Sequence, residues 1–384
     1  MNRFAKGVWH GCDNAEHRLN GELAKQVRLD LPHLGHGIKS QEFLRFIASR
    51  IEQLLAEHNC GAVQAIAVWA HNVDRVASIT GGESMKVFIT GAAGYIGGSV
   101  AVTLIKAGHK VAGLVRSEKR ARQVEPFGIE PVIGDLADSA VLERSAGSAD
   151  AVFNVANSDN RDVVDLFLNV MQGTGKTFIQ SSGTSIVADL ADGEHPGKIY
   201  DETTPLDPLP LRAGRVALND AVLAASNAQL RTMVICPSLI YGIGLGASSD
   251  SMQVPWMIDL ARKHAIGRHI GPGENIWSNV HINDLVDLYV RALQDAPGGA
   301  FYYAENGENS MRELAEAVSR MLGHGGRTQR MTVEEAVAEW GEGGARYTMG
   351  SNSRVRAVRA RQELGWSPSA PSLLDEVERG CYRS

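Results

Sequence analysis

One glycine-rich segment of the chain has the residue types and spacing of a phosphate-binding loop. Gly91-Ala92-Ala93-Gly94-Tyr95-Ile96-Gly97 follows an apolar run, Lys86–Thr90, and opens a stretch with helical periodicity, Tyr95–Ala107. In that context Gly91 permits a tight turn, Gly94 lets the backbone approach a pyrophosphate, and Gly97 allows close packing of helix on strand. The free amides at a helix start bind such an anion. The segment therefore predicts a dinucleotide site that includes Ala93, Tyr95 and Ile96.

The end of the next apolar run bears on which dinucleotide is bound. Lys110–Val115 is followed by Arg116 and Ser117, with no acidic residue at its end. An acid at this position hydrogen-bonds the ribose 2′-hydroxyl of NAD, whereas an arginine pairs with the 2′-phosphate of NADP. The sequence favours NADP, with NAD as the alternative cofactor.

The elements that must position these residues alternate between strand and helix from Met85 onward. Apolar strand cores separated by helical stretches indicate an α/β fold, a doubly wound parallel sheet of Rossmann type. Ligands of such sheets bind at the carboxyl ends of the strands, where Tyr241 follows a strand and is a candidate proton donor. The expected strands are Lys86–Thr90, Lys110–Val115, Pro131–Ile133, Ala149–Val155, Thr177–Gln180 and Thr232–Cys236. The expected helices are Tyr95–Ala107, Arg161–Met171, Leu211–Ser226, Asn283–Gln294 and Met311–Leu322.

Three parts of the chain are expected. Residues 1–84 form an extension of unassigned role, within which Gln41–His58 has helical periodicity. Residues 85–240 form the nucleotide-binding domain. Residues 241–384, which look less regular and are rich in Gly, Ser and Trp, form mainly a smaller substrate-binding lobe, with segments that return to the core.

The composition excludes several classes of protein. The formal net charge of −6 over 384 residues argues against general nucleic-acid binding. Four scattered cysteines, with no C-x-x-C pair, argue against a disulfide framework and a structural zinc site, and the histidines show no metal-binding spacing. No apolar run could span a bilayer and no signal peptide is visible, so a cytoplasmic protein without membrane association is expected.

From Met85 to its end the chain resembles the extended short-chain dehydrogenase/reductases, the NAD-dependent epimerase/dehydratase family. The resemblance implies roles for residues beyond the phosphate loop. Ser182 corresponds to the family's catalytic Ser or Thr, Thr184 is a nearby second hydroxyl, and the resemblance also implies homodimers. The segments that carry it are Thr90–Gly97, Gly134-Asp135-Leu136 near the adenine, Asn154-Val155-Ala156 beside the ribose, Ser181-Ser182, the nicotinamide segment Cys236–Gly242 with Pro237, Val280–Asp284 and Glu363–Pro368.

The chain departs from this family at the catalytic helix. The family carries Tyr-x-x-x-Lys, and the corresponding positions here are Leu211 and Arg215. Leucine cannot donate a proton; arginine can hold the cofactor ribose but stays protonated. Replacement donors are Tyr241, Tyr200 or a water held by Ser182.

These observations predict an NAD(P)-dependent oxidoreductase acting on a small carbonyl or alcohol. Two alternatives remain open at this point. One is a sugar-nucleotide epimerase or dehydratase, which the missing tyrosine disfavours. The other is a non-catalytic, redox-sensing NADP-binding protein.

Overall fold

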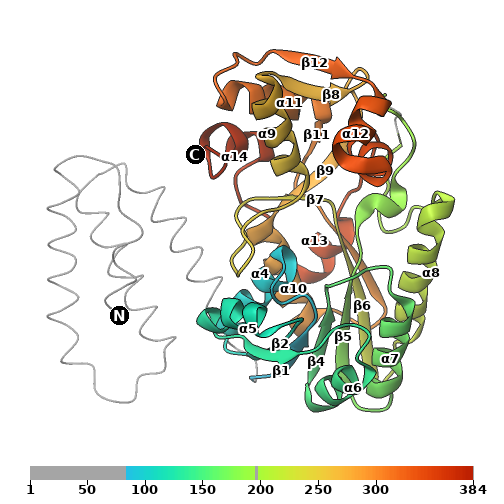
Figure 1. The fold of residues 1–384 in the computed structure, drawn as a ribbon. Coiled ribbons are helices and arrows are strands. Elements are labelled where there is room, and N and C mark those ends of the chain that lie inside the picture. The colour runs from blue at the N-terminus through green and yellow to red at the C-terminus, as the bar shows by residue number, and fades with distance from the viewer. Residues whose placement is uncertain (1–83, 195–197, 384) are drawn as a thin grey trace, which may run out of the picture. The chain divides into compact units, whose positions relative to one another are not determined.

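A seven-stranded parallel sheet forms the base of the molecule, with strand order β10-β6-β5-β4-β1-β2-β3 (Figure 1). The computed structural model describes residues 84–194 and 198–383, so nearly all of the predicted extension, including its helix Gln41–His58, lies outside the described residues. The strands of the large sheet are β1 (Lys86–Ile89), β2 (Lys110–Val115), β3 (Glu130–Ile133), β4 (Ala151–Asn154), β5 (Lys176–Ser181), β6 (Leu230–Pro237) and β10 (Ala300–Ala304).

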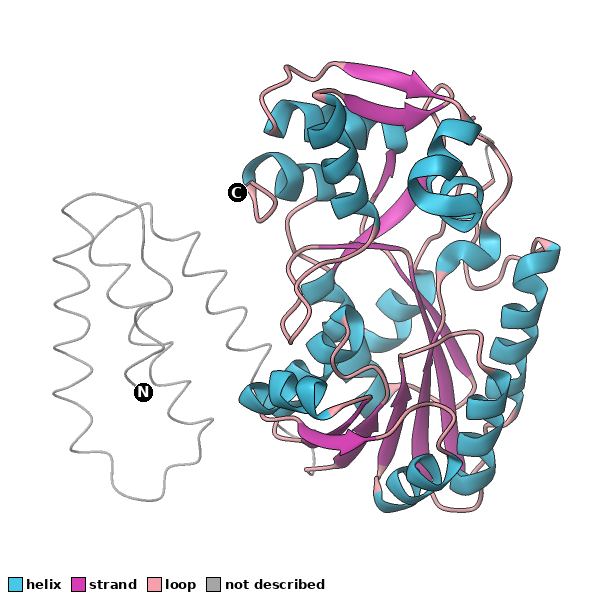
Figure 2. Cartoon of the chain, in the orientation of Figure 1, coloured by secondary structure: helices cyan, strands magenta, loops and turns pink. Residues whose placement is uncertain are grey.

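Helices cover both faces of this sheet because alternate strand residues point to opposite sides (Figure 2). In β1, Val87 and Ile89 enter one apolar cluster, whereas Phe88 enters another. The first cluster includes residues of α4 (Tyr95–Lys106), α5 (Glu118–Val124), α10 (Ile282–Asp295) and α13 (Val358–Leu364). The second includes residues of α6 (Ser139–Ser148), α7 (Arg161–Met171) and α8 (Pro210–Ala224). The predicted doubly wound α/β fold is confirmed.

The chain beyond β6 builds a second layer of structure with its own apolar cluster, in which Trp277 and Met311 are buried. We expected this stretch to be less regular, and that expectation was wrong. Its strands are short, from three residues in β7 to six in β9, and so few residues carry little periodicity in the sequence. The elements are β7 (Leu239–Tyr241), α9 (Gln253–His264), β8 (Gly267–Ile270), β9 (Ile276–His281), β11 (Glu308–Ser310), α11 (Met311–Met321), β12 (Thr328–Met331), α12 (Val333–Gly344) and α14 (Leu373–Arg379).

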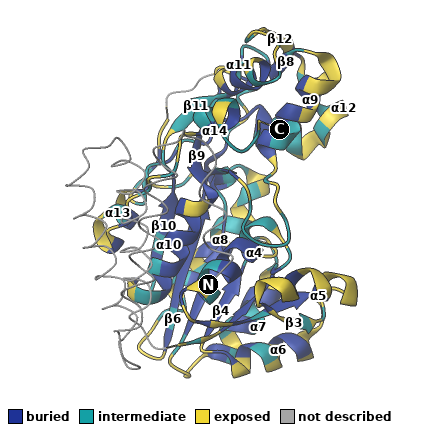
Figure 3. Ribbon diagram, turned by 90° about the vertical axis from the view of Figure 1, so that its left-hand side faces the viewer, coloured by how far each residue is buried: buried dark blue, intermediate teal, exposed yellow. Residues whose placement is uncertain are grey.

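Two small sheets frame this second layer, one of order β11-β9-β7 and one that pairs β12 with β8. Between these segments the chain returns to the large sheet, where β10 lies parallel to β6 and α10 packs against α4. Figure 3 shows the resulting burial along the large sheet, with exposed positions on the outer helix faces. Short helical turns complete the fold at Glu125–Phe127, Thr184–Val187 and Ala345–Met349.

Within the described ranges, none of the helices combines the length and the apolar character that crossing a bilayer requires.

Candidate functional site

A cavity of about 770 Å³ lies at the carboxyl-terminal ends of the sheet strands. This is the edge at which doubly wound sheets bind ligands, and the volume is that of a small-molecule site. Its lining divides into two halves. The first comes from the loops after β1, β2, β3 and β4, with Gly91, Ala93, Gly94, Tyr95, Ile96, Gly97, Leu114, Val115, Arg116, Arg120, Asp135, Leu136, Val155 and Ala156. The second comes from β5 onward, with Ser182, Gly183, Thr184, Ser185, Arg212, Arg215, Pro237, Ser238, Ile240, Asp250, Ser251, Met252, Gln253, Trp277 and Thr348.

The glycine loop has the geometry of a pyrophosphate cradle. Gly91 has a φ of 75°, and a β-carbon added there would lie 3.1 Å from the Ala156 Cα. A β-carbon on Gly97 would lie only 2.3 Å from the Gly91 carbonyl oxygen. Gly94 precedes the first residue of α4, and no side chain caps this helix start. Uncapped amides at the positive end of a helix fit an anionic phosphate group.

A ladder of buried side chains joins three strand ends beneath the cavity. The Thr90 hydroxyl donates to Asn154 Oδ1 at 2.8 Å and accepts the backbone amides of Val155 and Ala156. Asn154 Nδ2 then donates to Gln180 Oε1 at 2.9 Å. We expected Asn154 to contact the cofactor. Instead, both polar atoms of its side chain are hydrogen-bonded within this ladder, and the residue does not line the cavity. Its role in the structure is to fix the loops that line the cavity.

Two arginines line the cavity beyond the end of β2: Arg116, which follows this strand directly, and Arg120 in α5. Asp135 and Leu136, expected near the adenine, line the same part. Ser117 differs from the expectation, because its hydroxyl caps α5 by accepting the Arg120 amide and does not line the cavity.

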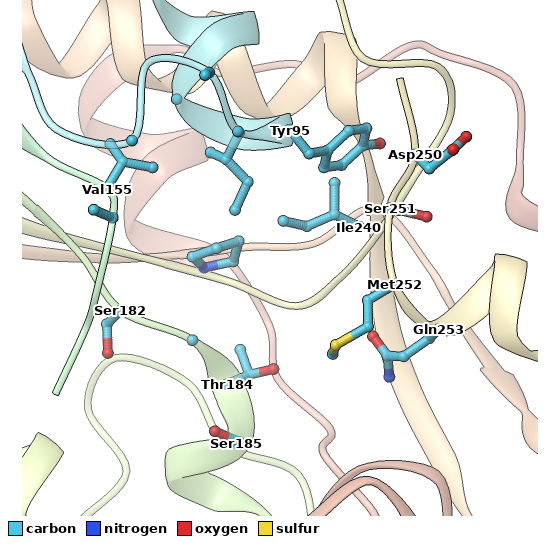
Figure 4. A pocket seen from close by; sticks show the side chains of 18 of the residues that line it. Tyr95, Val155, Ser182, Thr184, Ser185, Ile240, Asp250, Ser251, Met252 and Gln253 are labelled. Carbon is cyan, nitrogen blue, oxygen red and sulfur yellow. The ribbon is translucent and has the colours of Figure 1, made fainter. Parts of the chain in front are cut away.

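Ser182 and Thr184 line the other half of the cavity (Figure 4). Asn219, which is buried on α8, donates from Nδ2 to the Ser182 hydroxyl oxygen at 2.9 Å. Since that oxygen accepts from Asn219, the Ser182 proton is directed away from Asn219, and in the structure it is hydrogen-bonded to the Cys236 sulfur. A weak acceptor such as a thiol can be exchanged for a stronger one, a substrate oxygen. Beneath Ser182, burial raises the pKa of the Cys236 thiol to about 12. Cys236 therefore stays a neutral thiol and does not supply a thiolate.

Arg215 lies in the cavity wall as expected, and the structure shows how it is held. Its Nε and Nη2 donate to the two carboxylate oxygens of Asp159 at 2.6 and 2.5 Å, and its Nη1 donates to Ser185 at 3.0 Å. The hydrogen bond from Arg215 lowers the pKa of Asp159. Leu211, one helical turn earlier, is 60% exposed and lies outside the cavity lining.

Tyr241 does not reach the cavity, although we expected it there as a proton donor. It is fully buried, and its hydroxyl donates to the Pro371 carbonyl oxygen at 2.8 Å. Its ring lies edge-on to His281, and burial raises its pKa. The Tyr241 side chain lies in the apolar cluster of the second layer, because β7 pairs with β9 and leaves the edge of the large sheet. Tyr200, the other tyrosine considered, is also absent from the lining.

Sequence reasoning missed a group of lining residues that are far apart in the chain. Arg212 could have been found, since it lies three positions before Arg215 and residues at this spacing share a helix face. For the others no local pattern exists, because long-range folding brings them to the cavity. They are Asp250, Ser251, Met252, Gln253, Trp277 and Thr348.

Comparison with known proteins gives a family match over most of the described chain. The model of the NAD dependent epimerase/dehydratase family matches residues 87–302. The chain is 30% identical over 337 residues to the oxidase ucsJ of an Acremonium species, covering 76% of this chain and 95% of that protein.

A second relative and a solved structure extend this comparison. The chain is 27% identical over 236 residues to 4-hydroxy-2-methyl-3-oxo-4-farnesyl-3,4-dihydroquinoline-1-oxide ketoreductase of Stigmatella aurantiaca, covering 58% of this chain and 69% of that one. Among solved structures, dTDP-glucose 4,6-dehydratase from Bacillus anthracis in complex with NAD superposes with a TM-score of 0.62 at 18% identity. That match covers 77% of this chain and 95% of the dehydratase.

Proposed function

The chain belongs to the NAD-dependent epimerase/dehydratase family, and from that premise we propose that it is an NADP-linked oxidoreductase that interconverts a small carbonyl compound and its alcohol. One observation carries the proposal: a single cavity runs from the uncapped start of α4 to the hydroxyl of Ser182. A dinucleotide whose phosphates sit at the first end can extend its nicotinamide toward the second. The ketoreductase relative supports a carbonyl substrate.

The chemistry assigned to this site uses hydroxyl groups in place of the family's tyrosine. When bound, the nicotinamide supplies or accepts the hydride. Ser182, oriented by Asn219, donates a hydrogen bond to the substrate oxygen, and Thr184 provides a second hydroxyl beside it. Donors aimed at an oxygen that gains negative charge stabilise the transition state. The proton that completes the alcohol comes from water, since neither hydroxyl has a pKa suited to release it near neutral pH.

Arg215 has a positioning role in this proposal. Asp159 and Ser185 fix its guanidinium at the cavity wall, where it can bind the ribose nearest the nicotinamide. Because arginine remains protonated, it contributes charge and hydrogen bonds but does not shuttle protons.

The test of the reaction is NADPH consumption against a panel of aldehydes and ketones, with Ser182→Ala as the variant. Loss of one such donor is expected to lower kcat by about 10²–10³-fold, while the Kd for NADPH stays within about twofold of wild type. Ser148→Ala, on the exposed side of α6, is the matched control. Saturable NADPH binding without turnover of any compound would favour the redox-sensing alternative.

The preference for NADP rests on Arg116 and Arg120, which line the cavity at the end of β2 where no acid stands. Arg116→Ala is expected to weaken NADPH binding by about 10–100-fold, since charge-assisted hydrogen bonds contribute about 1.5–3 kcal/mol. Binding of NADH, which lacks the 2′-phosphate, should not change. Equal losses for both cofactors would contradict the assignment.

A further inference from the structure

The substrate half of the cavity contains buried polar atoms without a partner. Among the residues that the structure describes, eight buried side-chain nitrogen or oxygen atoms have no hydrogen-bond partner. Three of the eight belong to residues that line this cavity: Thr184 Oγ1, Arg212 Nε and Gln253 Nε2. Each can donate, and leaving such a group unsatisfied costs about 1–3 kcal/mol. Their concentration in one half of the cavity indicates a ligand rich in acceptor oxygens.

The charges around Arg212 do not balance. Arg212 and Arg215 lie on the same helix, and both are close to the single carboxylate of Asp159. Asp159 uses both oxygens on Arg215. Within residues 84–194 and 198–383, the structure gives the Arg212 guanidinium neither a hydrogen bond nor an ion pair. One positive charge at the cavity wall is therefore left for an anion from outside the chain.

The position of Arg212 is unfavourable for the fold itself. It lies in the first turn of α8, which begins at Pro210 and carries no acidic residue there. A cation near a helix start opposes the helix dipole. Burial, and then the proximity of Arg215, lower the pKa of Arg212. Desolvation and the repulsion from Arg215 outweigh the attraction of Asp159 for the Arg212 charge, whereas an anionic ligand would gain from both the guanidinium and the helix start.

Gln253 faces the same cavity from another element. It is the first residue of α9, is only 6% exposed, and follows Met252, which is 49% exposed. Figure 4 shows Met252 and Gln253 on one side of the cavity, and Thr184 and Ser185 on another. A ligand held by Arg212 and Gln253 is thus contacted from both layers of the molecule.

We propose that the substrate carries a carboxylate, which Arg212 binds as an ion pair and Gln253 hydrogen-bonds, while its carbonyl oxygen lies at Ser182. This inference rests on the proposed oxidoreductase function and names its substrate class, a small oxo-acid or the matching hydroxy-acid. A single negative charge matches Arg212, the one cation in the substrate half for which the described residues provide no ion pair. A phosphate would bring up to two charges into a cavity that also contains Asp250.

The reaction then balances without a further reactant. The carbonyl carbon of the oxo-acid gains a hydride from NADPH and its oxygen gains a proton from water, so that NADP⁺, the hydroxy-acid and a hydroxide ion are formed, and the solvent buffer neutralises the hydroxide. The carboxylate takes no part in bond making, so its binding site affects how tightly the substrate is held more than how fast it reacts.

The experiment measures kcat/KM for three oxo-acids and for the methyl ester of each. The acids are pyruvate, acetoacetate and levulinate, in which the distance between the carbonyl and the carboxylate increases in this order. Wild-type protein should reduce at least one acid with a kcat/KM about tenfold or more above that of its ester, as expected for a charged hydrogen bond. Arg212→Met, which keeps an unbranched apolar stem but removes the guanidinium and its charge, should abolish this preference by raising KM with little change in kcat. Arg212→Lys should restore part of it, and Arg144→Met on α6 is the control.

Three results would overturn the carboxylate assignment. The first is a preference for esters over acids, the second is an unchanged acid-to-ester ratio in Arg212→Met, and the third is inorganic phosphate binding at Arg212 more tightly than any of the acids. If no compound is reduced, the oxidoreductase proposal fails separately. The carboxylate site at Arg212 is then tested by calorimetric titration of the NADP-loaded full chain with each of the three acids. An affinity that falls about tenfold in Arg212→Met supports this site. Equal affinity in wild type and variant, or no binding to either, refutes it.

Discussion

The two halves of the cavity are built in different ways. The half beside α4 is made largely of backbone: three glycines, a helix start without a cap, and a turn held by the Thr90 hydroxyl. The half beside α8 and α9 is made of side chains from distant segments, several with polar atoms that lack partners. The backbone part of the first half can bind only what every dinucleotide shares, the pyrophosphate, and the choice between NAD and NADP is left to the side chains of Arg116 and Arg120. The second half, made of side chains, can be specific for one compound.

The largest effect on cofactor affinity is expected from adding a side chain to the glycine loop of the backbone half. In Gly97→Ala the new methyl group would lie 2.3 Å from the Gly91 carbonyl oxygen, so the loop must move. Overpacking of this kind costs about 1–3 kcal/mol, and NADPH affinity should fall by up to about 100-fold. Fluorescence titration measures the affinity, and thermal unfolding checks that the variant is folded.

Gly147→Ala is the matched control for this variant, because Gly147 is exposed on α6 and a β-carbon there meets nothing within 4 Å. NADPH binding by Gly97→Ala at wild-type strength would show that the loop does not hold the pyrophosphate, and the contrast between the two halves would be lost.

A smaller effect is expected from the ion pairs that support the side-chain half. Glu308 on β11 accepts from Arg354 and Arg356, and β11 pairs with β9, which carries Trp277 into the cavity wall. Arg354 first, and then Arg356, lower the pKa of Glu308 to about 2. Since the folded pKa is depressed, the stabilisation is present above the ordinary value of 4.5 and is lost as the pH falls toward 2.

Glu308→Gln should therefore lower the free energy of unfolding by about 1–2 kcal/mol near pH 7, after allowance for solvent screening. The difference from wild type should shrink as the pH falls from about 4.5 toward 2. Urea unfolding at a series of pH values measures both. A difference that stays constant with pH would mean that the ion pairs do not stabilise this half.

The smallest effect on turnover is expected at Leu211, which was predicted from the sequence to occupy the family's tyrosine position. Leu211 is 60% exposed and outside the cavity lining, so Leu211→Ala should change kcat/KM by less than about twofold. Steady-state kinetics with any accepted carbonyl compound provides the measurement. A tenfold or greater loss of kcat/KM would mean that the start of α8 contacts the substrate, and that Leu211 belongs to the side-chain half of the cavity.

Much of the fold could be predicted because its determinants are local. The Arg161–Met171 helix was predicted with the bounds that the structure shows, since Asn160 caps it and its apolar face is regular. The same holds for the glycine loop, in which seven consecutive residues carry the whole pattern. The strands after β6 are too short for such patterns, and their register depends on pairing with strands far away in the chain.

The side-chain half could be predicted only in part, for a related physical reason. Ser182 and Arg215 lie at positions fixed by the family pattern and do line the cavity. Tyr241 follows a strand, but β7 joins a different sheet, and this change of direction removes its hydroxyl from the cavity. Gln253 and Trp277 reach the wall only through the packing of the second layer, which no local spacing encodes.

The ladder from Thr90 through Asn154 to Gln180 has an evolutionary consequence. It joins the ends of β1, β4 and β5 through buried groups that do not line the cavity, and so fixes the span between these strand ends. Residues on α8 and α9 can therefore be exchanged without disturbing that span. A few substitutions on these two helices can therefore change which substrate is bound, while the loops that line the cofactor half keep their positions.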